Sequence, residues 1–311
     1  MLARVPVNIP VTLGRRKCGN APRSPVAAAT SDLGKEVETS RRQLLLGTGL
    51  LAIAPGLLTA SSSHASIPGP RLPSAAEQAA LDGALRPIIT KGKAAVALRL
   101  IFHDCGTFQS SAANGGANAS IRFELDRPEN GGLKRGWRLI ETVAKGLSGT
   151  AAAGVSQADL VALCGARAVA VCGGPQVQVR LGRQDASGPD PEGRLPGEQL
   201  TSQQLKDVFS AKGFSSREFL ALCGAHTLGS KGFGDPTTFD NVYFKELLRK
   251  PWLDTKDSMA AMIGLPSDHV LPDDPELLPM IQAYADDQAL FFNDFQLAFQ
   301  KLSELGTGWD A

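Results

Sequence analysis

This sequence contains few histidines, no paired cysteine motif and no marked excess of positive or negative charge. Only four of its 311 residues are histidine, and its five cysteines form no CxxC pair and have no zinc-site spacing. The cysteines beyond Cys18 are interpreted as buried free thiols, with a disulfide left open for an oxidising compartment. The formal net charge is +1, which is not the strongly basic balance of a nucleic-acid-binding protein. What remains is an ordinary globular composition, with 43% hydrophobic and 20% charged residues.

Residues 1–65 differ in composition from the rest of the chain. They contain eight of the 32 basic residues but only three of the 31 acidic ones, and residues 1–31 contain no acid at all. This composition predicts a plastid transit peptide. Arg41-Arg42 and the apolar stretch 44–60 also resemble a twin-arginine signal, so both the chloroplast stroma and the thylakoid lumen stay open. The stretch is short for a membrane span and is interrupted by proline, so no permanent membrane anchor is expected.

The remaining residues, 66–311, predict a nearly all-α domain. No internal repeat or long alternating run is present, and 176–181 is at most a short strand. Ser74 and Ser215 each begin a capping box, in which a serine is followed three residues later by glutamate. Apolar spacing and caps predict further helices at about 94–103, at 133–147, after Ser156, at 202–209, and in a last segment carrying Tyr284, Phe291, Phe295, Phe299 and Leu305. The domain is either one unit or two closely packed helical lobes around a shared ligand.

Two of the four histidines lie in settings that point to one chemistry. His103 ends an apolar helical segment in which Arg99 lies one turn earlier, so both side chains share a face. Heterolysis of a peroxide requires a base that takes and returns a proton and a fixed positive charge, which His103 and Arg99 can supply. His226 lies far downstream near the end of another predicted helix, where it could hold an iron from the other side. The pattern therefore predicts a haem site that activates peroxide.

These segments resemble the plant haem peroxidase superfamily, and most closely the plastid ascorbate peroxidase-related group. The resemblance spans about residues 75–306, with the motifs in family order. It is carried by the runs 98–107, 115–123, 173–175, 182–185, 191–196, 224–229, 231–236, 239–241, 264–269 and 302–306. It implies the haem peroxidase fold, with two helical lobes enclosing one haem b, hydrogen peroxide as the oxidant and a small-molecule reductant.

The resemblance assigns roles on the peroxide side of the haem. It implies that Arg99 and His103 form the catalytic pair and that Phe102 lies beside the haem. It also implies that Asn130 accepts a hydrogen bond from the His103 imidazole and keeps it basic. The alternative for Asn130 is a turn residue before Gly131.

On the opposite side, the resemblance implies that His226 is the axial ligand of the haem iron. Asp268 would accept the proton of that imidazole and raise its basicity, and its alternative is a turn or N-cap residue. Oxygen-bearing side chains near His226 match a cation site of the family for K⁺ or Ca²⁺. These are Thr227, Asp235, Thr238 and Asp240.

The departures from the family concern the electron donor. Phe102 stands where ascorbate peroxidases have tryptophan, so it can neither donate a hydrogen bond nor form the tryptophan adduct that catalase activity needs. The segment between His226 and Asp240 is shorter than in those enzymes, and the missing part includes their ascorbate-binding arginine and proximal tryptophan. The resemblance therefore implies a peroxidase that forms a ferryl intermediate but does not use ascorbate as its main donor.

Two other functions stay open at this point. Loss of the donor site motivates a non-catalytic haem-binding or scaffold protein of the same fold in the chloroplast. A haem-free helical domain would require His226 to be a plain helix-end residue. Retention of Arg99, His103, Asn130 and Asp268 favours the enzyme, because a scaffold needs none of them.

Overall fold

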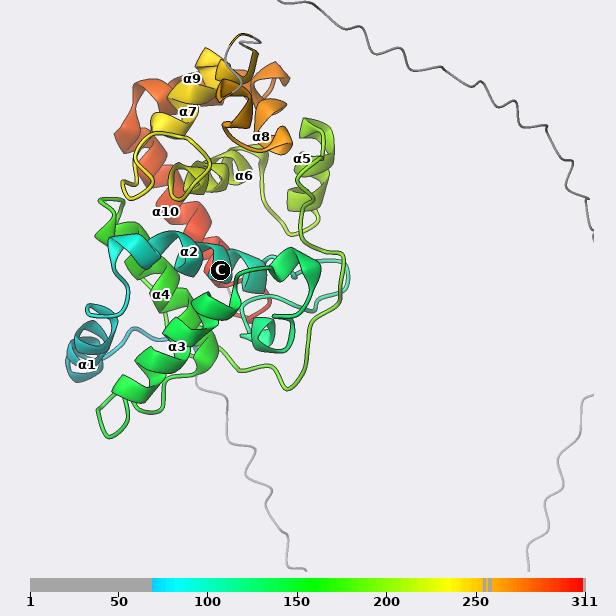
Figure 1. Cartoon of the computed structure of the whole chain (residues 1–311). Coiled ribbons are helices and arrows are strands. Elements are labelled where there is room, and N and C mark those ends of the chain that lie inside the picture. Colours follow the sequence, from blue (N-terminus) through cyan, green and yellow to red (C-terminus); the bar gives the residue numbers. More distant parts are fainter. Residues whose placement is uncertain (1–68, 254–255, 257–258, 310–311) are drawn as a thin grey trace, which may run out of the picture. The chain divides into compact units, whose positions relative to one another are not determined.

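The computed structural model describes residues 69–253, 256 and 259–309 (Figure 1). The predicted all-α fold is confirmed: the described residues form ten α-helices joined by loops and short 3-10 turns. Within these ranges the β pairing consists of two isolated bridges, Arg71 with Leu181 and Gln109 with Asn114. The N-terminal segment 1–65 lies outside the described residues. In the part of the chain that is described, no helix has the length and apolar character needed to cross a membrane.

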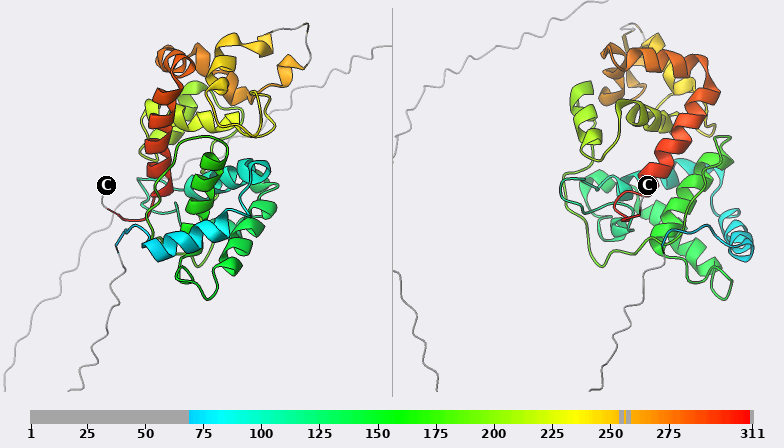
Figure 2. Two further views of the ribbon diagram at one scale, coloured as in Figure 1. Left: turned by 90° about the vertical axis from the view of Figure 1, so that its left-hand side faces the viewer. Right: turned by 180° about the vertical axis from the view of Figure 1, so that it is seen from behind.

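The helices form two lobes, as Figures 1 and 2 show. The first lobe contains α1 (Ala75–Leu85), α2 (Lys91–Cys105), α3 (Lys134–Gly146) and α4 (Gln157–Val171). The second contains α5 (Ser202–Ser210), α6 (Ser216–Cys223), α7 (Val242–Arg249), α8 (Pro266–His269) and α9 (Leu278–Asp286). The last helix, α10 (Gln288–Ser303), packs against α6 and α9 and also against α2. It therefore joins the two lobes.

Local sequence signals start the helices where they were predicted. Ser215 precedes α6, and its Oγ accepts a bond from the Glu218 amide at 3.2 Å while Glu218 accepts one from the Ser215 amide at 2.8 Å. The same reciprocal cap forms between Ser74 and Glu77 at the start of α1. Ser156 caps α4 by accepting a bond from the Asp159 amide. These caps satisfy amides that the first helical turn leaves without partners.

Close packing of α2 on α4 fixes the helix that carries Arg99 and His103. Gly165 of α4 lies directly against Ile101 of α2, and a Cβ built on Gly165 would lie 2.6 Å from Ile101 Cγ2. Any side chain at 165 would push the helices apart. The buried face of α2 is thereby held in the first lobe, while the face with Arg99 and His103 remains for the site.

The predicted last helix is wrong in one respect, because the chain divides it at Asp287. This residue leaves helical geometry, and its carboxylate accepts bonds from the amides of Ala289 and Leu290 at the start of α10. Both helices turn apolar residues toward the same core, so the spacing of Tyr284 and Phe291 concealed the break. The break is an N-cap, which the pattern of apolar residues does not report.

The cysteines mainly occupy the core. The four described cysteines are all free thiols, and Cys105, Cys164 and Cys172 are buried while Cys223 is half-buried. Burial raises the pKa of the Cys164 thiol, which keeps it protonated and unreactive. These residues act as small apolar groups in the packing.

Candidate active site

The imidazole of His103 is held by a side-chain amide. His103 Nδ1 lies 2.7 Å from Asn130 Oδ1, and Asn130 Nδ2 donates to the Glu124 carbonyl at 3.0 Å. Because the second bond fixes the orientation of the amide, its oxygen faces the ring and Nδ1 carries the proton. Asn130 is buried in the first lobe. Its neutral acceptor therefore leaves Nε2 of His103 as the proton-accepting nitrogen.

Arg99 lies one turn before His103 and meets it, as the spacing predicts. Its Nε donates to His103 Nε2 at 3.2 Å. Its two Nη atoms donate to the carbonyls of Gly131 and Glu129, each at 2.7 Å. The turn that contains Asn130 thus holds both the base and the cation in place.

The environment keeps His103 neutral. Burial is the largest effect on its pKa and the positive charge of Arg99 is the second, and together they lower it to about 4. The bond to Asn130 opposes this shift without cancelling it. At neutral pH the imidazole is therefore an unprotonated base.

Phe102 of α2 packs between His103 and the second lobe. Its ring meets His103 edge-on, with the centroids 5.9 Å apart, and it stacks on Phe209 of α5 at 6.1 Å. Phe209 in turn packs on Phe219 of α6 at 4.6 Å. This row of rings connects α2 with the second lobe.

In the second lobe His226 is backed by a carboxylate. The α-helix α6 ends at Cys223, earlier than predicted, and the chain tightens into a 3-10 turn (Gly224–Thr227) that carries His226. His226 Nδ1 lies 2.8 Å from Asp268 Oδ1, and Asp268 Oδ2 accepts a bond from the Leu265 amide at 2.8 Å. Asp268 thus combines the two roles considered for it, the imidazole partner and the turn residue.

Each residue of this pair shifts the pKa of the other. Burial alone would lower the pKa of His226, but the Asp268 carboxylate outweighs burial and raises it. Burial alone would likewise raise the pKa of Asp268, but His226, together with the Leu265 amide and the Tyr243 hydroxyl, outweighs burial and lowers it. Asp268 is therefore an ionised carboxylate in a buried position, stabilised by the imidazole.

The sequence interpretation missed the importance of Tyr243. Its hydroxyl donates to Asp268 Oδ1 at 2.8 Å, and the residue is completely buried. Tyr243 lies in the first turn of α7, just after the Phe239-Asp240-Asn241 run. That proximity to a family motif was the available signal, but the sequence did not show which acceptor its hydroxyl would reach.

The loop after His226 lies against the helix that carries His103. A Cβ built on Gly229 would lie 3.3 Å from Ala95 Cβ, and Gly229 has a positive φ of 98°, so a side chain would be crowded and strained there. Ala95, Arg99 and His103 are spaced by four residues and share one face of α2, over about 12 Å of helix axis. The turn with His226 therefore approaches the face of α2 that carries Arg99 and His103.

A second connection comes from the loop before α5. The Glu198 carbonyl accepts a bond from the Ser267 amide at 3.0 Å, next to Asp268. The Glu198 carboxylate is near enough to act electrostatically on both Arg99 and His226. The loop before α5 thus lies near residues of both histidine networks.

The four residues predicted to hold a cation form two pairs. Thr227 Oγ1 donates to Asp240 Oδ1 at 2.9 Å, and Thr238 Oγ1 donates to Asp235 Oδ2 at 2.8 Å. Among the residues that the structure describes, no cluster of three or more His, Cys, Asp or Glu side chains could hold a metal ion. The K⁺ or Ca²⁺ site stays a prediction.

The residues present fit a haem. Both histidines use Nδ1 for a side-chain oxygen, which leaves Nε2 of each ring for another group. The side chain of His226 keeps 39% of its surface accessible although its partner Asp268 is only 2% exposed. An accessible imidazole nitrogen backed by a carboxylate is the donor set of a peroxidase iron.

This fold and these two networks define a haem peroxidase. The family model described as "Peroxidase" matches residues 77–287, and the chain belongs to this family. "Putative L-ascorbate peroxidase 6" of Arabidopsis thaliana is 49% identical over 226 residues, covering 73% of this chain and 68% of the relative. "L-ascorbate peroxidase 5, peroxisomal" of Arabidopsis thaliana is 38% identical over 71% of this chain and 80% of its own length. "L-ascorbate peroxidase 1, cytosolic" of Oryza sativa subsp. indica is 38% identical over 71% of this chain and 90% of its own.

The protein is accordingly an enzyme that reduces hydrogen peroxide with the help of haem b, as the sequence predicted. The alternative of a non-catalytic scaffold is not favoured by these relatives.

Proposed function

We propose that Arg99, His103 and Asn130 form the distal side of the haem, where peroxide reacts, and that His226 and Asp268 form the proximal side, which holds the iron. The observation that carries this proposal is the engagement of both imidazoles through Nδ1, at 2.7 and 2.8 Å. This arrangement leaves Nε2 of His226 to bind the iron and Nε2 of His103 to accept a proton. Bound haem would supply a Lewis-acidic iron that takes up the peroxide and the electrons for cleavage of its O–O bond.

The distal residues then move one proton. His103 Nε2 takes it from one peroxide oxygen and returns it to the other, which leaves as water. Arg99 stabilises the negative charge that develops on the leaving oxygen, and it stays charged throughout. Arg99 Nε donates to His103 Nε2 at 3.2 Å, so the incoming peroxide replaces this contact. Asn130 keeps the other ring proton on Nδ1, so the same nitrogen is the base in every cycle.

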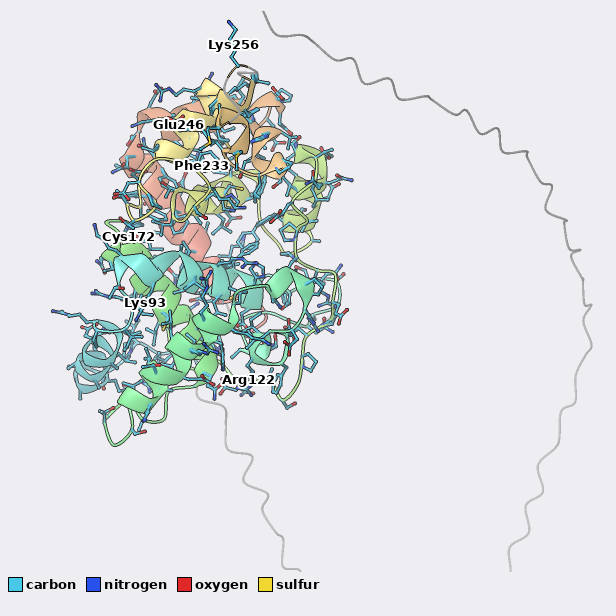
Figure 3. The ribbon with its side chains drawn as sticks, viewed as in Figure 1. Lys93, Arg122, Cys172, Phe233, Glu246 and Lys256 are labelled. Atoms are coloured by element: carbon cyan, nitrogen blue, oxygen red, sulfur yellow. The ribbon has the colours of Figure 1, made fainter. Side chains whose placement is uncertain are left out.

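The proposed electron donor is a small reductant other than ascorbate, such as a phenol. The relatives are named ascorbate peroxidases, which makes ascorbate the comparison to test. In the short segment between His226 and Asp240, the buried Phe233 (labelled in Figure 3) packs on Tyr243 with ring centroids 4.8 Å apart. An apolar ring directed inward offers no charge to the ascorbate anion.

A donor screen on the haem-loaded protein tests this choice. Peroxide-dependent turnover is measured with ascorbate and with a simple phenol, and kcat/KM is compared between them. We expect the larger value for the phenol. A larger value for ascorbate would overturn the proposal about the donor and leave the peroxide chemistry intact.

We further propose that residues 1–65 direct the protein to the chloroplast and that 66–311 form the peroxidase domain. The support is the composition of the first 65 residues, which is rich in arginine and poor in acids. Two of the relatives carry the words peroxisomal and cytosolic in their names, so the location needs a direct test. A fluorescent fusion of the full chain should enter plastids, and one that lacks 1–65 should not.

A further inference from the structure

The chain has only two tyrosines, and both hydroxyls bind a carboxylate. Tyr284 donates to Asp294 at 2.7 Å, and Asp294 also accepts a bond from Arg217, which is exposed. Tyr243 donates to Asp268 at 2.8 Å, next to the proximal imidazole. The two residues are equally buried, so they differ chiefly in what their carboxylate does.

One oxygen of Asp268 serves two donors. Oδ1 accepts both the N–H of His226 and the O–H of Tyr243, each at 2.8 Å, while Oδ2 accepts the Leu265 amide. A carboxylate oxygen that already accepts a strong hydrogen bond has less negative charge to offer a second donor. The phenol therefore competes with the imidazole for the same acceptor.

We propose that Tyr243 is a positioning residue that sets the basicity of the proximal imidazole by sharing Asp268 Oδ1 with it. This inference rests on the proposed role of His226 as the iron ligand. By taking part of the negative charge of Asp268, the phenol limits how far the ring approaches an imidazolate. It would thereby keep the reduction potential of the bound iron higher than the His226–Asp268 pair alone would set it.

The packing around Tyr243 gives its hydroxyl no freedom. The ring lies against Phe233 and Phe244, with centroids 4.8 and 5.0 Å away, and His226 meets it edge-on at 5.9 Å. The residue has no exposed surface, so water cannot replace Asp268 as its acceptor. Burial, followed by the charge of Asp268, raises the pKa of the phenol well above its usual range, so it remains a donor.

Removal of this hydroxyl should change the properties of the bound iron in a definite direction. In Tyr243→Phe, Asp268 Oδ1 accepts only the His226 N–H, so the imidazole becomes a stronger electron donor. We expect the Fe(III)/Fe(II) potential of the haem-loaded protein to shift downward and the iron–histidine stretching frequency of the ferrous form to shift upward. The matched control, Tyr284→Phe, removes the other buried hydroxyl and should leave both readouts unchanged.

A second variant keeps the hydroxyl at position 243 and covers the case in which Tyr243→Phe fails to fold or to retain haem. Tyr284→Phe protein produced with 3-fluorotyrosine carries the fluorinated ring only at position 243. Fluorination makes the phenol a stronger donor, so the potential should shift upward and the stretching frequency downward. Tyr284→Phe protein with ordinary tyrosine is the reference.

Asp268→Asn separates failure of this inference from failure of the proposed proximal side. This substitution removes the negative charge that His226 and Tyr243 share, so the Fe(III)/Fe(II) potential of the variant should shift upward. If the potential shifts in Asp268→Asn but in neither protein changed at position 243, the role of Tyr243 is refuted and the proximal pair stands. If Asp268→Asn has no effect either, the proposed function of the pair is refuted as well.

Discussion

The two histidine networks use the same bond in opposite electrostatic settings. His103 and His226 each place Nδ1 within 2.8 Å of a side-chain oxygen. The partner of His103 is the neutral amide of Asn130, and burial with Arg99 lowers its pKa to about 4. The partner of His226 is the ionised carboxylate of Asp268, which raises its pKa. The surroundings, and not the ring itself, therefore make the difference: burial and Arg99 keep His103 unprotonated, whereas a carboxylate raises the pKa of His226.

The two sides also differ in how they are anchored. On the distal side the polar groups end on backbone carbonyls, those of Glu124, Glu129 and Gly131. On the proximal side they end on one buried carboxylate with three donors. The distal groups thus end on neutral acceptors, whereas the three proximal donors share one negative charge.

The largest expected effect comes from removing the distal base. His103→Leu should lower the rate of reaction with hydrogen peroxide by about 10²–10⁴-fold, because no other group moves the proton. The rate is measured by stopped-flow absorbance of the haem-loaded protein. The resting haem spectrum should stay unchanged, because the proximal network is intact, and a loss of rate below ten-fold would contradict the assignment of the base.

On the proximal side, Asp268→Asn should weaken haem binding by about 10–100-fold, because the imidazole loses its charged partner. Haem transfer to an acceptor protein measures this loss. Asp294→Asn is the matched control, since it changes the carboxylate that binds the other buried tyrosine. Equal haem loss in both variants would mean that only folding is affected.

Giving His103 a carboxylate partner should reduce the difference between its pKa and that of His226. In the unchanged protein the peroxide rate should fall only as the pH approaches about 4, where His103 becomes protonated. In Asn130→Asp the new carboxylate raises the pKa of His103, so the acidic limb of the pH–rate profile should move upward. An acidic limb at the same pH in both proteins would contradict the role of the amide.

The same shift has a consequence for folding stability. His103 has a folded-state pKa below its ordinary value of 6.5. Its contribution to stability is therefore present above pH 6.5 and is lost as the pH falls through about 4. Denaturant unfolding at a series of pH values should show this loss in the unchanged protein and a weaker one in Asn130→Asp.

The smallest expected effect concerns the turn that carries His226. A Cβ on Gly224 would lie 2.4 Å from Cε2 of the buried Phe291 ring, so Gly224→Ala should destabilise the fold by about 1–3 kcal/mol. Gly83→Ala is the control, because the space at that helical position is open and alanine should stabilise it by roughly 0.5–1 kcal/mol. Urea unfolding measures both. Destabilisation of similar size at the two positions would show that the crowding at Gly224 is not the cause.

Much of the site could be predicted because its signals are local in sequence. The four-residue spacing of Arg99 and His103 places them on one face of a helix wherever that helix packs. Ser215 and Glu218 start the helix that leads to His226 through bonds confined to one turn. Asn130 and Asp268 carry no such local signal, and they were predicted only through the resemblance.

The amino-acid sequence by itself determined the all-α class, the caps at Ser74, Ser156 and Ser215, the shared face of Arg99 and His103, and the family. Only the tertiary structure decided that Asn130 and Asp268 reach the two rings, that Asp287 interrupts the last helix, and that Tyr243 shares Asp268 with His226. The physical reason is the range of the interactions. Helix periodicity and capping depend on residues three or four apart, whereas the acceptor of a buried polar group and its pKa depend on whatever the packed chain brings beside it.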